Sequence, residues 1–500
     1  MLVAMTAGER DGSPAPPLVV AAGAEALTPT GRAADRDLVA TVDDAALAAV
    51  VAGGPAAARV LAAVRRADLL APATGAVADA LASIVPVGPW DMAVGLGSGP
   101  DGAAVDAALA RRRPRPGRPR HVAFVTPLPP DATGVAGYSH RLAEALARRA
   151  RVTCVVTGPV TDDRRPAGAV LAAVDDLGAL VRSGTVDEVV YALGNHPAHG
   201  TQLALLRRWP GAVQLHDVRL VGAYAGLHAP GDPLADEVQR IYPGRFDRAL
   251  LRDGELTMGP AVAAGLWLVR EVAALATTVL THSAYAAALV ADDAHVTPAC
   301  IGPLAHPAVS PRAVPSAYDE ALVVSVGAVD ESKRCAVLVD ALAALPAARR
   351  PRLALVGPVA PAYRARLQRL AAERGVDDRL VLTGWVPDHE LDAWLRRAAV
   401  AVQLRGPSNG ESSAAVAECV ARGVPTVVSD GGALRELPGD AVVHVPADVD
   451  PAGLAAELDA LLSDVDRRGA LHRAALAHAA ATGFDAAAER LLAALFGPDR

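Results

Sequence analysis

The chain has 500 residues, 52% of them hydrophobic, and its 48 basic and 55 acidic residues give a net charge of −7. At roughly 150 residues per domain this length predicts about three domains, and the hydrophobic content can fill their cores, which excludes a disordered protein. The acidic balance and an aromatic content of 3% argue against a nucleic-acid binder.

The four cysteines, Cys154, Cys300, Cys335 and Cys419, lie far apart and form no CxxC pair. This spacing predicts reduced thiols in a cytosol rather than a disulfide framework or a zinc site. The sequence contains no uninterrupted apolar window of about 18 residues, and its start has no basic region leading into an apolar stretch. We therefore expect a cytoplasmic protein, whose contact with a membrane is at most peripheral and at the inner face.

Residues 1–115 are rich in alanine and lead into a run of arginine and proline at 111–120. Proline and glycine interrupt a regular helix there, so the run predicts a linker after an N-terminal extension of unknown role. Gly97–Gly102 matches the G-x-G-x-x-G dinucleotide motif, but no second strand ending in an acid follows about 20 residues later. A nicotinamide-dependent enzyme is thus a weaker alternative, which predicts NAD binding that is lost when residues 1–115 are deleted.

Strands and helices alternate from residue 120 onward. The predicted strands are His121–Thr126, Val152–Thr157, Glu188–Leu193, Ala212–Leu215 and Thr278–Thr281, the first helix is Tyr138–Arg149, a later one ends at Arg208, and Ser283 caps another. Such alternation is typical of a parallel sheet with crossover helices. We expect a Rossmann-like domain over 120–308.

The alternation restarts after a stretch rich in proline and serine at His306–Asp319. The predicted strands are Leu322–Val326, Arg352–Val356, Leu380–Thr383, Ala399–Leu404 and Thr426–Ser429, and the predicted helices are Ser332–Leu345, Pro361–Arg374, Glu390–Arg397, Ser412–Arg422 and Phe484–Phe496. We expect a second Rossmann-like domain over 318–485 and a terminal helix within 484–500. The predicted fold class is α/β, with two doubly wound domains whose ligands bind at the carboxyl ends of the strands, in a cleft between the domains.

Lys333 is the only lysine of the chain, which excludes a Gly-Lys-Ser/Thr phosphate loop. Lys333 and Arg334 are predicted to open the helix after Leu322–Val326, with Ser332 as N-cap. Two cations there oppose the helix dipole, and such local conflict is expected where function overrides stability. We expect the pair and nearby amides to bind an anion, preferably a diphosphate. The alternative is two solvated side chains.

The segment Arg405–Pro425 ends a strand, turns through a loop rich in glycine and starts a helix of small residues. Glu411 and Glu418 are seven residues apart, so both can project from one helix face, one toward a sugar and the other toward a ribose. The alternative is a capping box of Ser408 with Glu411, and a solvated Glu418. The residues alone favour neither interpretation.

With these motifs, residues 120–495 resemble the family-4 glycosyltransferases of the GT-B type. Glu418–Pro425 is similar to the second half of the family's E-x7-E motif and to its G-x-P. The family's first acid falls on Gly410, with Glu411 displaced by one, and Ala328 replaces a usual arginine. Lys333 and Arg334 stand where the family keeps its basic pair. Further matches are Gly357, Gly384, Trp385–Pro387, Gly431, Gly432 and Glu436–Pro438.

The resemblance implies a hexosyltransferase, for example a mannosyltransferase of polysaccharide biosynthesis, that is retaining and independent of metals and cofactors. Its donor substrate would be a nucleotide-diphospho-sugar, and its acceptor a hydroxyl of a glycan or a lipid-linked glycan. The donor-binding residues implied are Gly134, Lys333, Arg334, Gly410, Ser412, Ser413 and Glu418. Asp448–Asp450 matches the D-x-D metal signature of another glycosyltransferase fold, but we expect it to start a surface helix, and we expect no metal site.

In the first domain, Pro127–Ser139 resembles the family's glycine loop, whose amides approach the donor's phosphates or the acceptor. The alternative is a tight turn from strand to helix. His216 ends a strand where the family has a histidine that lines the donor sugar. The expected catalytic residues are His216, Asp217, which would orient it, and Glu411. Asn195 and Tyr138 are expected on the acceptor side.

A second class of function is also consistent with the sequence. Gly410 and Ala328 occupy positions where the family is usually charged, which suggests a catalytically weak partner or scaffold that binds sugar nucleotides. Turnover distinguishes the two, because such a partner would bind a nucleoside diphosphate and transfer no sugar.

Overall fold

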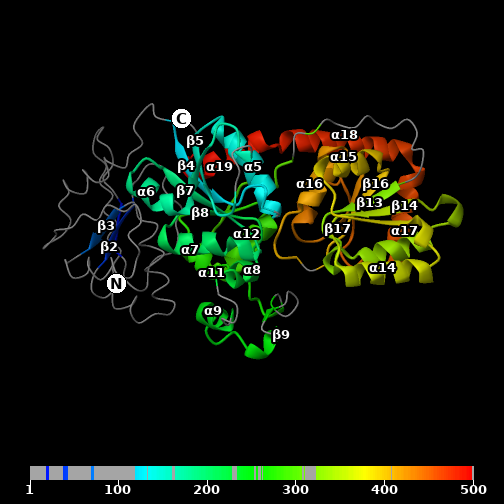
Figure 1. Ribbon diagram of the computed structural model, residues 1–500, viewed down its shortest axis with the longest axis horizontal. Helices are drawn as coiled ribbons and strands as arrows, with labels where there is room; N and C mark the ends of the chain where they lie inside the picture. Colours follow the sequence, from blue (N-terminus) through cyan, green and yellow to red (C-terminus); the bar gives the residue numbers. More distant parts are fainter. Residues whose placement is uncertain are drawn as a thin grey trace. The chain divides into compact units, whose positions relative to one another are not determined.

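The computed structural model describes residues 18–21, 38–42, 69–72, 119–131, 133–159, 164–227, 234–252, 255–256, 261, 263–306, 309, 322–406 and 408–497. The predicted turn at Gly97–Gly102 and most of the predicted linker lie outside these residues. The chain divides into two compact units, the first formed by Met1–Thr281, Ala287–Ile301 and Glu489–Arg500 and the second by His282–Ala286 and Gly302–Ala488. In both units helices surround a parallel sheet (Figure 1).

The first unit contains a sheet of seven parallel strands in the order β12-β11-β8-β7-β4-β5-β6. The strands are β4 (His121–Thr126), β5 (Arg151–Val156), β6 (Val170–Ala173), β7 (Glu188–Leu193), β8 (Ala212–Leu215), β11 (Val279–Thr281) and β12 (Ala299–Cys300). Successive strands are added on one side of β4 up to β6 and then on the other from β7. The order therefore reverses between β4 and β7, which makes this point the switch point where such sheets bind ligands.

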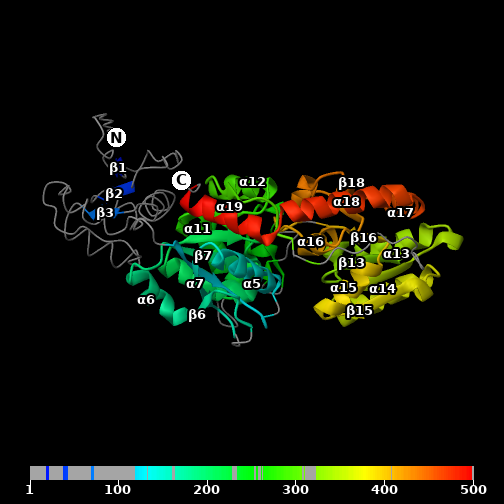
Figure 2. The same ribbon diagram turned by 90° about the horizontal axis from the view of Figure 1, so that it is seen from above.

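Besides the seven-stranded sheet, the described residues form two smaller sheets. The strands β1 (Leu18–Ala21), β2 (Leu38–Val42) and β3 (Leu69–Pro72) pair in parallel, and β9 (Leu251–Arg252) pairs with β10 (Glu255–Leu256) in antiparallel fashion. The helices are α5 (Gly134–Ala147), α6 (Leu177–Arg182), α7 (Gly200–Arg208), α8 (Val221–Ala225), α9 (Leu234–Ile241), α11 (Arg270–Leu275) and α12 (Ala284–Ala294). Figure 2 shows most of them from above.

One helix boundary differs from its predicted position, and another helix lies where it was predicted. α5 begins four residues before the predicted Tyr138, because the Thr133 side chain caps it by accepting a hydrogen bond from the Ala136 amide at 3.2 Å. The last helix, α19 (Phe484–Phe496), is where the sequence predicts it. Its carboxyl half packs with the first unit, since Glu489 pairs with Arg149 at 2.7 Å and Arg490 donates to the Ile301 carbonyl at 2.6 Å.

The second unit contains six parallel strands in the order β15-β14-β13-β16-β17-β18. They are β13 (Leu322–Val326), β14 (Arg352–Val356), β15 (Leu380–Gly384), β16 (Val400–Gln403), β17 (Thr426–Asp430) and β18 (Val443–Pro446). Numbered by appearance, this is the Rossmann order 3-2-1-4-5-6, whose switch point lies between β13 and β16. The predicted α/β class with doubly wound sheets is confirmed.

This sheet is buried on both faces by helices. These are α13 (Cys335–Ala344), α14 (Pro361–Glu373), α15 (Asp388–Arg397), α16 (Ala414–Ala421), α17 (Pro451–Ser463) and α18 (Val465–Ala481). Val323 packs into a core with α13, α14 and α17, whereas the next residue, Val324, packs into a core with α15 and α16. Figure 1 shows α14 and α17 on one side of the strands and α15 and α16 on the other. Burial on both faces explains the continuous apolar strand sequences.

Within the described ranges no helix is both long and apolar enough to cross a membrane. The same ranges hold no group of three or more His, Cys, Asp or Glu side chains arranged to bind a metal ion. Asp450 of the D-x-D match starts α17, as predicted, because its side chain accepts a hydrogen bond from the Gly453 amide at 2.7 Å.

Candidate functional site

The carboxyl ends of β13 and β14 approach each other closely. Gly327 and Gly357 follow these strands and have φ angles of +102° and +149°. A Cβ atom on Gly357 would lie 2.0 Å from the Gly327 carbonyl oxygen, so only glycine fits there. Because both residues are glycines, neither has a side chain that covers this edge of the sheet. The backbone at Gly327 lies next to Lys333.

The start of α13 differs from the prediction. Lys333 ends a 3-10 turn, Glu331–Lys333, and Arg334 adopts a left-handed conformation with φ of +52° and ψ of +36° before the helix begins at Cys335. The prediction that Ser332 caps the helix and that both cations lie in its first turn is therefore wrong. The left-handed residue interrupts the helical backbone, so the side chains of Lys333 and Arg334 point into different environments.

Lys333 lies almost buried at the switch point, with 7% of its surface exposed. Its Nζ lies 3.6 Å from the position of a Cβ added to Gly327. Burial and the nearby Arg405 guanidinium lower the pKa of Lys333 to about 8, although Asp330 and Glu411 act in the opposite direction. The site thus holds a cation that has lost much of its hydration and that an anion would stabilise.

Arg334 has a different environment. Its guanidinium donates hydrogen bonds to the carbonyl oxygens of Ala447 at 2.6 Å and Val449 at 2.7 Å. These bonds hold the connection from β18 to α17. The structure therefore does not bring Arg334 and Lys333 together as a pair of free cations.

The loop after β16 is closed by Glu411. Its carboxylate accepts hydrogen bonds from the Ser408 hydroxyl at 2.9 Å and the Asn409 amide at 2.6 Å, and it lies 3.3 Å from Nη1 of Arg405. The helix α16 begins three residues later, capped by Ser413, whose hydroxyl accepts from the Val416 amide at 3.3 Å. Glu411 is therefore not on the helix face of Glu418, and the capping-box alternative is wrong as well. Sequence reasoning missed Arg405, whose signal was its position directly after the strand.

Gly410 explains the missing acid of the motif. Its φ angle is +84°, and its amide donates to the Ser408 hydroxyl at 3.0 Å. A residue with a side chain is strained in this region, so glycine at 410 and the carboxylate at 411 are two parts of one loop conformation.

Glu418 lies on α16 and is 23% exposed. Its Oε2 atom is 2.5 Å from Nη1 of Arg422, whose Nε atom in turn is 2.8 Å from Asp392 on α15. Glu418 is thus oriented by a chain of ion pairs, while part of its carboxylate reaches solvent. Trp385, which follows β15, is 74% exposed and presents an apolar ring near the same edge of the sheet.

At the switch point of the first unit, the structure brings Tyr138 and His216 together. Their rings meet edge to face with 4.9 Å between centroids. Gly134, in the first turn of α5, is exposed, and a Cβ there would meet no atom within 4 Å. The fold does not itself require this glycine, which leaves the amino terminus of α5 open to a ligand.

Asn195 and Asp217 are also adjacent. The Asn195 amide donates to Oδ2 of Asp217 at 2.8 Å, and Asn195 Oδ1 accepts from the Gly222 amide at 2.6 Å. The His216 amide donates to the Leu193 carbonyl at 2.8 Å. The residues predicted from the ends of β7 and β8 therefore form one hydrogen-bonded group with the start of α8.

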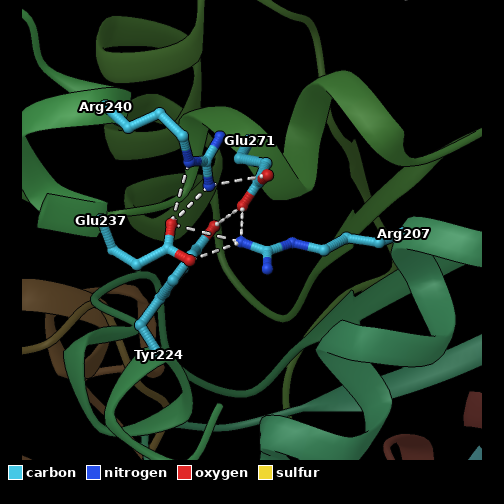
Figure 3. A network of polar contacts seen from close by, with 5 residues as sticks. All are labelled: Arg207, Tyr224, Glu237, Arg240 and Glu271. Carbon is cyan, nitrogen blue, oxygen red and sulfur yellow. Dashed lines mark hydrogen bonds and ion pairs between the residues drawn. The ribbon is translucent and has the colours of Figure 1, made fainter. Parts of the chain in front are cut away.

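Tyr224 of α8 takes part in a network of polar contacts with residues of neighbouring helices (Figure 3). Tyr224 donates to Glu271 at 2.7 Å, and Arg207 and Arg240 each lie 2.9 Å from Glu271. Glu237 pairs with the same two arginines at 3.2 and 2.5 Å. Burial acts to raise the pKa of Glu271, but the hydrogen bonds and charges of Arg207 and Arg240 outweigh it and hold that pKa below its usual value. The network joins α7, α8, α9 and α11.

Solved structures share the fold of this chain. The chain is similar to a glycosyltransferase from Rickettsia africae with a TM-score of 0.53 and 12% identity, over 75% of this chain and 98% of that one. It is similar to sucrose-phosphate synthase from Thermosynechococcus elongatus with a TM-score of 0.51 and 19% identity, over 74% and 97%. At these identities the likeness shows the fold alone, which is the GT-B fold of glycosyltransferase structures.

The family model of the glycosyl transferases group 1 matches residues 310–478, which cover most of the second unit. Relatives named D-inositol 3-phosphate glycosyltransferase share 38% identity over 184 residues in Thermobispora bispora and 39% over 128 residues in Frankia alni. These alignments cover 35% and 25% of this chain, and 42% and 31% of the relatives. The chain thus matches less than half the length of these relatives.

Proposed function

We propose that the chain is a glycosyltransferase that moves a hexose from a nucleotide-diphospho-sugar to a hydroxyl of a glycan or lipid-linked acceptor, with retention of configuration and without a metal ion. The match of residues 310–478 to the group 1 family supports the reaction class. Retention and metal independence follow from the family-4 resemblance. A lipid-linked acceptor would bring this cytoplasmic enzyme to the inner face of a membrane.

The observation that carries the proposal is Lys333. It is a nearly buried cation at the switch point of a Rossmann-order sheet, where ligands of such sheets bind. No ion pair to Nζ occurs within the described part of the chain. A diphosphate would bring further negative charge to Nζ in a site of low dielectric, where such an interaction is strong.

Other residues of the second unit fit roles around the same ligand. Amides at Ser412 and Ser413, at the start of α16, would neutralise the leaving diphosphate with Lys333 and Arg405. Glu418 would accept hydrogen bonds from the ribose hydroxyls, and the exposed face of Trp385 would stack on the base. On the first unit, considered by itself, Gly134, Asn195, Tyr138, His216 and Asp217 would bind the acceptor.

The scaffold alternative rests on Gly410 and Ala328. The left-handed φ of Gly410 accounts for the absent acid, and Glu411 keeps a carboxylate in the loop. No observation at Ala328 favours either function. We therefore propose turnover.

The test is nucleoside diphosphate binding by isothermal titration calorimetry, with UDP and GDP in the presence of a metal chelator. UDP is a reasonable first probe because the Anabaena protein HepE has been solved in complex with it. We expect Lys333→Met to weaken binding by about tenfold or more, which corresponds to ~1.4 kcal/mol. Transfer from UDP- and GDP-sugars is then followed with D-inositol 3-phosphate and glycan acceptors.

Arg334→Gln is the matched control. Because Arg334 binds two backbone carbonyls, we expect this variant to lower stability and to leave nucleotide affinity unchanged where it is folded. Equal affinity of Lys333→Met and the unaltered protein would contradict the donor site. Binding without transfer from any donor would favour the scaffold.

A further inference from the structure

Arg422 is a nearly buried arginine to which the proposed function gives no role. It is the C-cap residue of α16, the helix that carries Glu418, and only 5% of its surface is exposed. Its guanidinium contacts the Glu418 carboxylate, which is proposed above to bind the ribose. Arg422 can therefore affect ligand binding through the orientation of Glu418.

The contact between Arg422 and Glu418 follows from the geometry of a helix. Residues four apart lie on the same helix face, so the side chain of residue 422 reaches residue 418. Nη1 of Arg422 lies 2.5 Å from Oε2 of Glu418 and donates to the Glu418 carbonyl at 3.1 Å. A cation at this end of a helix binds carbonyls that lack a partner within the helix and interacts favourably with the helix dipole. These contacts alone would make Arg422 a cap that stabilises α16.

A contact with a second helix gives Arg422 more than the role of a cap. Its Nε atom donates to Oδ1 of Asp392 on α15 at 2.8 Å, and Oδ2 of Asp392 accepts from Nε of Arg396 at 2.5 Å. The donors of a guanidinium point in fixed directions, so bonds to Asp392 and to Glu418 together fix its plane. Because α15 and α16 pack into one core, Asp392 is a firm anchor for this arrangement.

The charges of this group are partly shielded from water. Burial acts to lower the pKa of Arg422, but Asp392 and Glu418 outweigh it and hold that pKa above its usual value. The side chains of Asp392 and Glu418 are 28% and 23% exposed, so salt screens these ion pairs less than pairs on an open surface. A glutamate that rotates freely loses conformational entropy when a ligand immobilises it. Glu418 is already restricted by Arg422, so less entropy is lost on binding.

We propose that Arg422 is a positioning residue that holds Glu418 in the orientation that binds a ribose hydroxyl, and that selectivity for ribonucleotides over deoxyribonucleotides depends on it. A carboxylate oxygen accepts more than one hydrogen bond, so an ion-paired Glu418 can still accept from a hydroxyl. A hydrogen bond to a charged group contributes more than one to a neutral group. This role rests on the proposed function, because it concerns the ribose contact of the proposed donor.

The first experiment compares a ribonucleotide with its deoxy analogues by isothermal titration calorimetry of the full chain. The probes are UDP, 2′-deoxy-UDP and 3′-deoxy-UDP, or the corresponding guanosine series if GDP binds more tightly. We expect the ribonucleotide to bind about tenfold more tightly than at least one of its deoxy analogues. Equal affinity for the ribonucleotide and both analogues would overturn the role of Glu418 at the ribose and, with it, that of Arg422.

The second experiment uses Arg422→Lys, which leaves the net charge unchanged. A lysine keeps the positive charge, but its ammonium group does not reproduce the planar fork that binds Glu418 and Asp392. We expect this variant to bind the weaker deoxy analogue within about twofold of the unaltered protein and to lose most of the preference for the ribonucleotide. Asp392→Asn, at a more exposed side chain, should also reduce this preference, and it serves if Arg422→Lys does not fold.

Arg468→Lys is the matched control. Arg468 is likewise a nearly buried arginine of the second unit, with 4% of its surface exposed, and it donates to the carbonyl oxygens of Leu461 and Leu462 near the end of α17. We expect this variant to lose stability and to keep the full preference for the ribonucleotide. A purely structural role of Arg422 would weaken all of these nucleotides equally, and that result, or an undiminished preference in Arg422→Lys and Asp392→Asn, would refute the positioning role.

Failure of the positioning role and failure of the proposed function give different results. Nucleotide binding that depends on Lys333, with a preference unchanged in Arg422→Lys, would contradict only the role of Arg422. A protein that shows the preference, loses it in Arg422→Lys and transfers no sugar would support Arg422 and contradict the proposed reaction. A protein that binds neither UDP nor GDP would contradict both.

Discussion

The phenol oxygen of Tyr224 lies 2.7 Å from Oε2 of Glu271, and this contact joins α8 to α11. Tyr224 is fully buried, and its helix carries Gly222, whose amide holds Asn195. The hydrogen bond therefore stabilises the helix that holds Asn195, a residue of the proposed acceptor side. The two residues that form the bond are far apart in sequence.

We expect Tyr224→Phe to lower the free energy of unfolding by about 1–3 kcal/mol, because the charged carboxylate loses a buried donor. Urea denaturation measures the change. The control is Arg248→Gln, which removes the 2.5 Å ion pair with Asp236, where both side chains are about two-thirds exposed (65% and 66%). That variant should change stability by less than about 1 kcal/mol, and an equal loss in both variants would show that the network has no special role.

The low pKa of Lys333 would make the proposed nucleotide binding depend on pH. Only the ammonium form attracts a diphosphate, and in the free protein this form is lost as the pH rises through about 8. A bound diphosphate raises the pKa of Lys333, so affinity should fall between pH 7.5 and 9.5 by up to about tenfold per pH unit. Titration of UDP across this range checks it, and Lys333→Met should show a nearly flat profile.

Gly410 should resist substitution although the resembled family has an acid there. Its φ of +84° makes alanine or glutamate strained, and we expect Gly410→Ala to cost about 1–2 kcal/mol of stability. Gly439→Ala is the control, because a Cβ on Gly439 would meet no atom within 4 Å and its φ is not positive. Thermal unfolding with equal losses in both variants would contradict the strain argument.

His306 should make the second unit sensitive to acid. Its Nδ1 lies 2.7 Å from the Thr482 hydroxyl, and burial together with His478 lowers its pKa from 6.5 to about 4. The unfolded chain then binds the proton more tightly than the folded one, so stability falls as the pH drops from about 6.5 toward 4. We expect His306→Asn, which keeps a donor for Thr482, to reduce the loss between pH 7 and pH 5 by about 2 kcal/mol in urea titrations. An identical loss in the variant would contradict this assignment.

The sequence predicts the strands better than the site. β4, β7, β8, β13 and β14 have the predicted bounds, because each is a mostly apolar run between turn residues. The start of α13 could not be predicted from the sequence, because arginine rarely adopts the left-handed conformation that Arg334 has. In the structure, Arg334 in this conformation donates hydrogen bonds to the carbonyl oxygens of Ala447 and Val449. The prediction missed β6, a strand of only four residues at the edge of its sheet.

Contacts between distant residues were equally invisible in the sequence. Arg207 and Glu271 are 64 residues apart, and neither lies in a motif. His199 is only one histidine in a short turn of the sequence, and its hydrogen bond to Gln202 is known only from the structure. The residues proposed for the site lie where a motif marks a strand end, whereas contacts defined only by three-dimensional packing had no signal in the sequence.

The single lysine allows selective chemical modification of the protein at one side chain. Reagents that acylate side-chain amines have one target in this chain, and the pKa of about 8 leaves a large neutral fraction of that amine under mildly alkaline conditions. A ligand seated on Lys333 would shield it from such reagents. The extent of acylation, read by mass spectrometry, therefore reports occupancy of this one position without any engineered label.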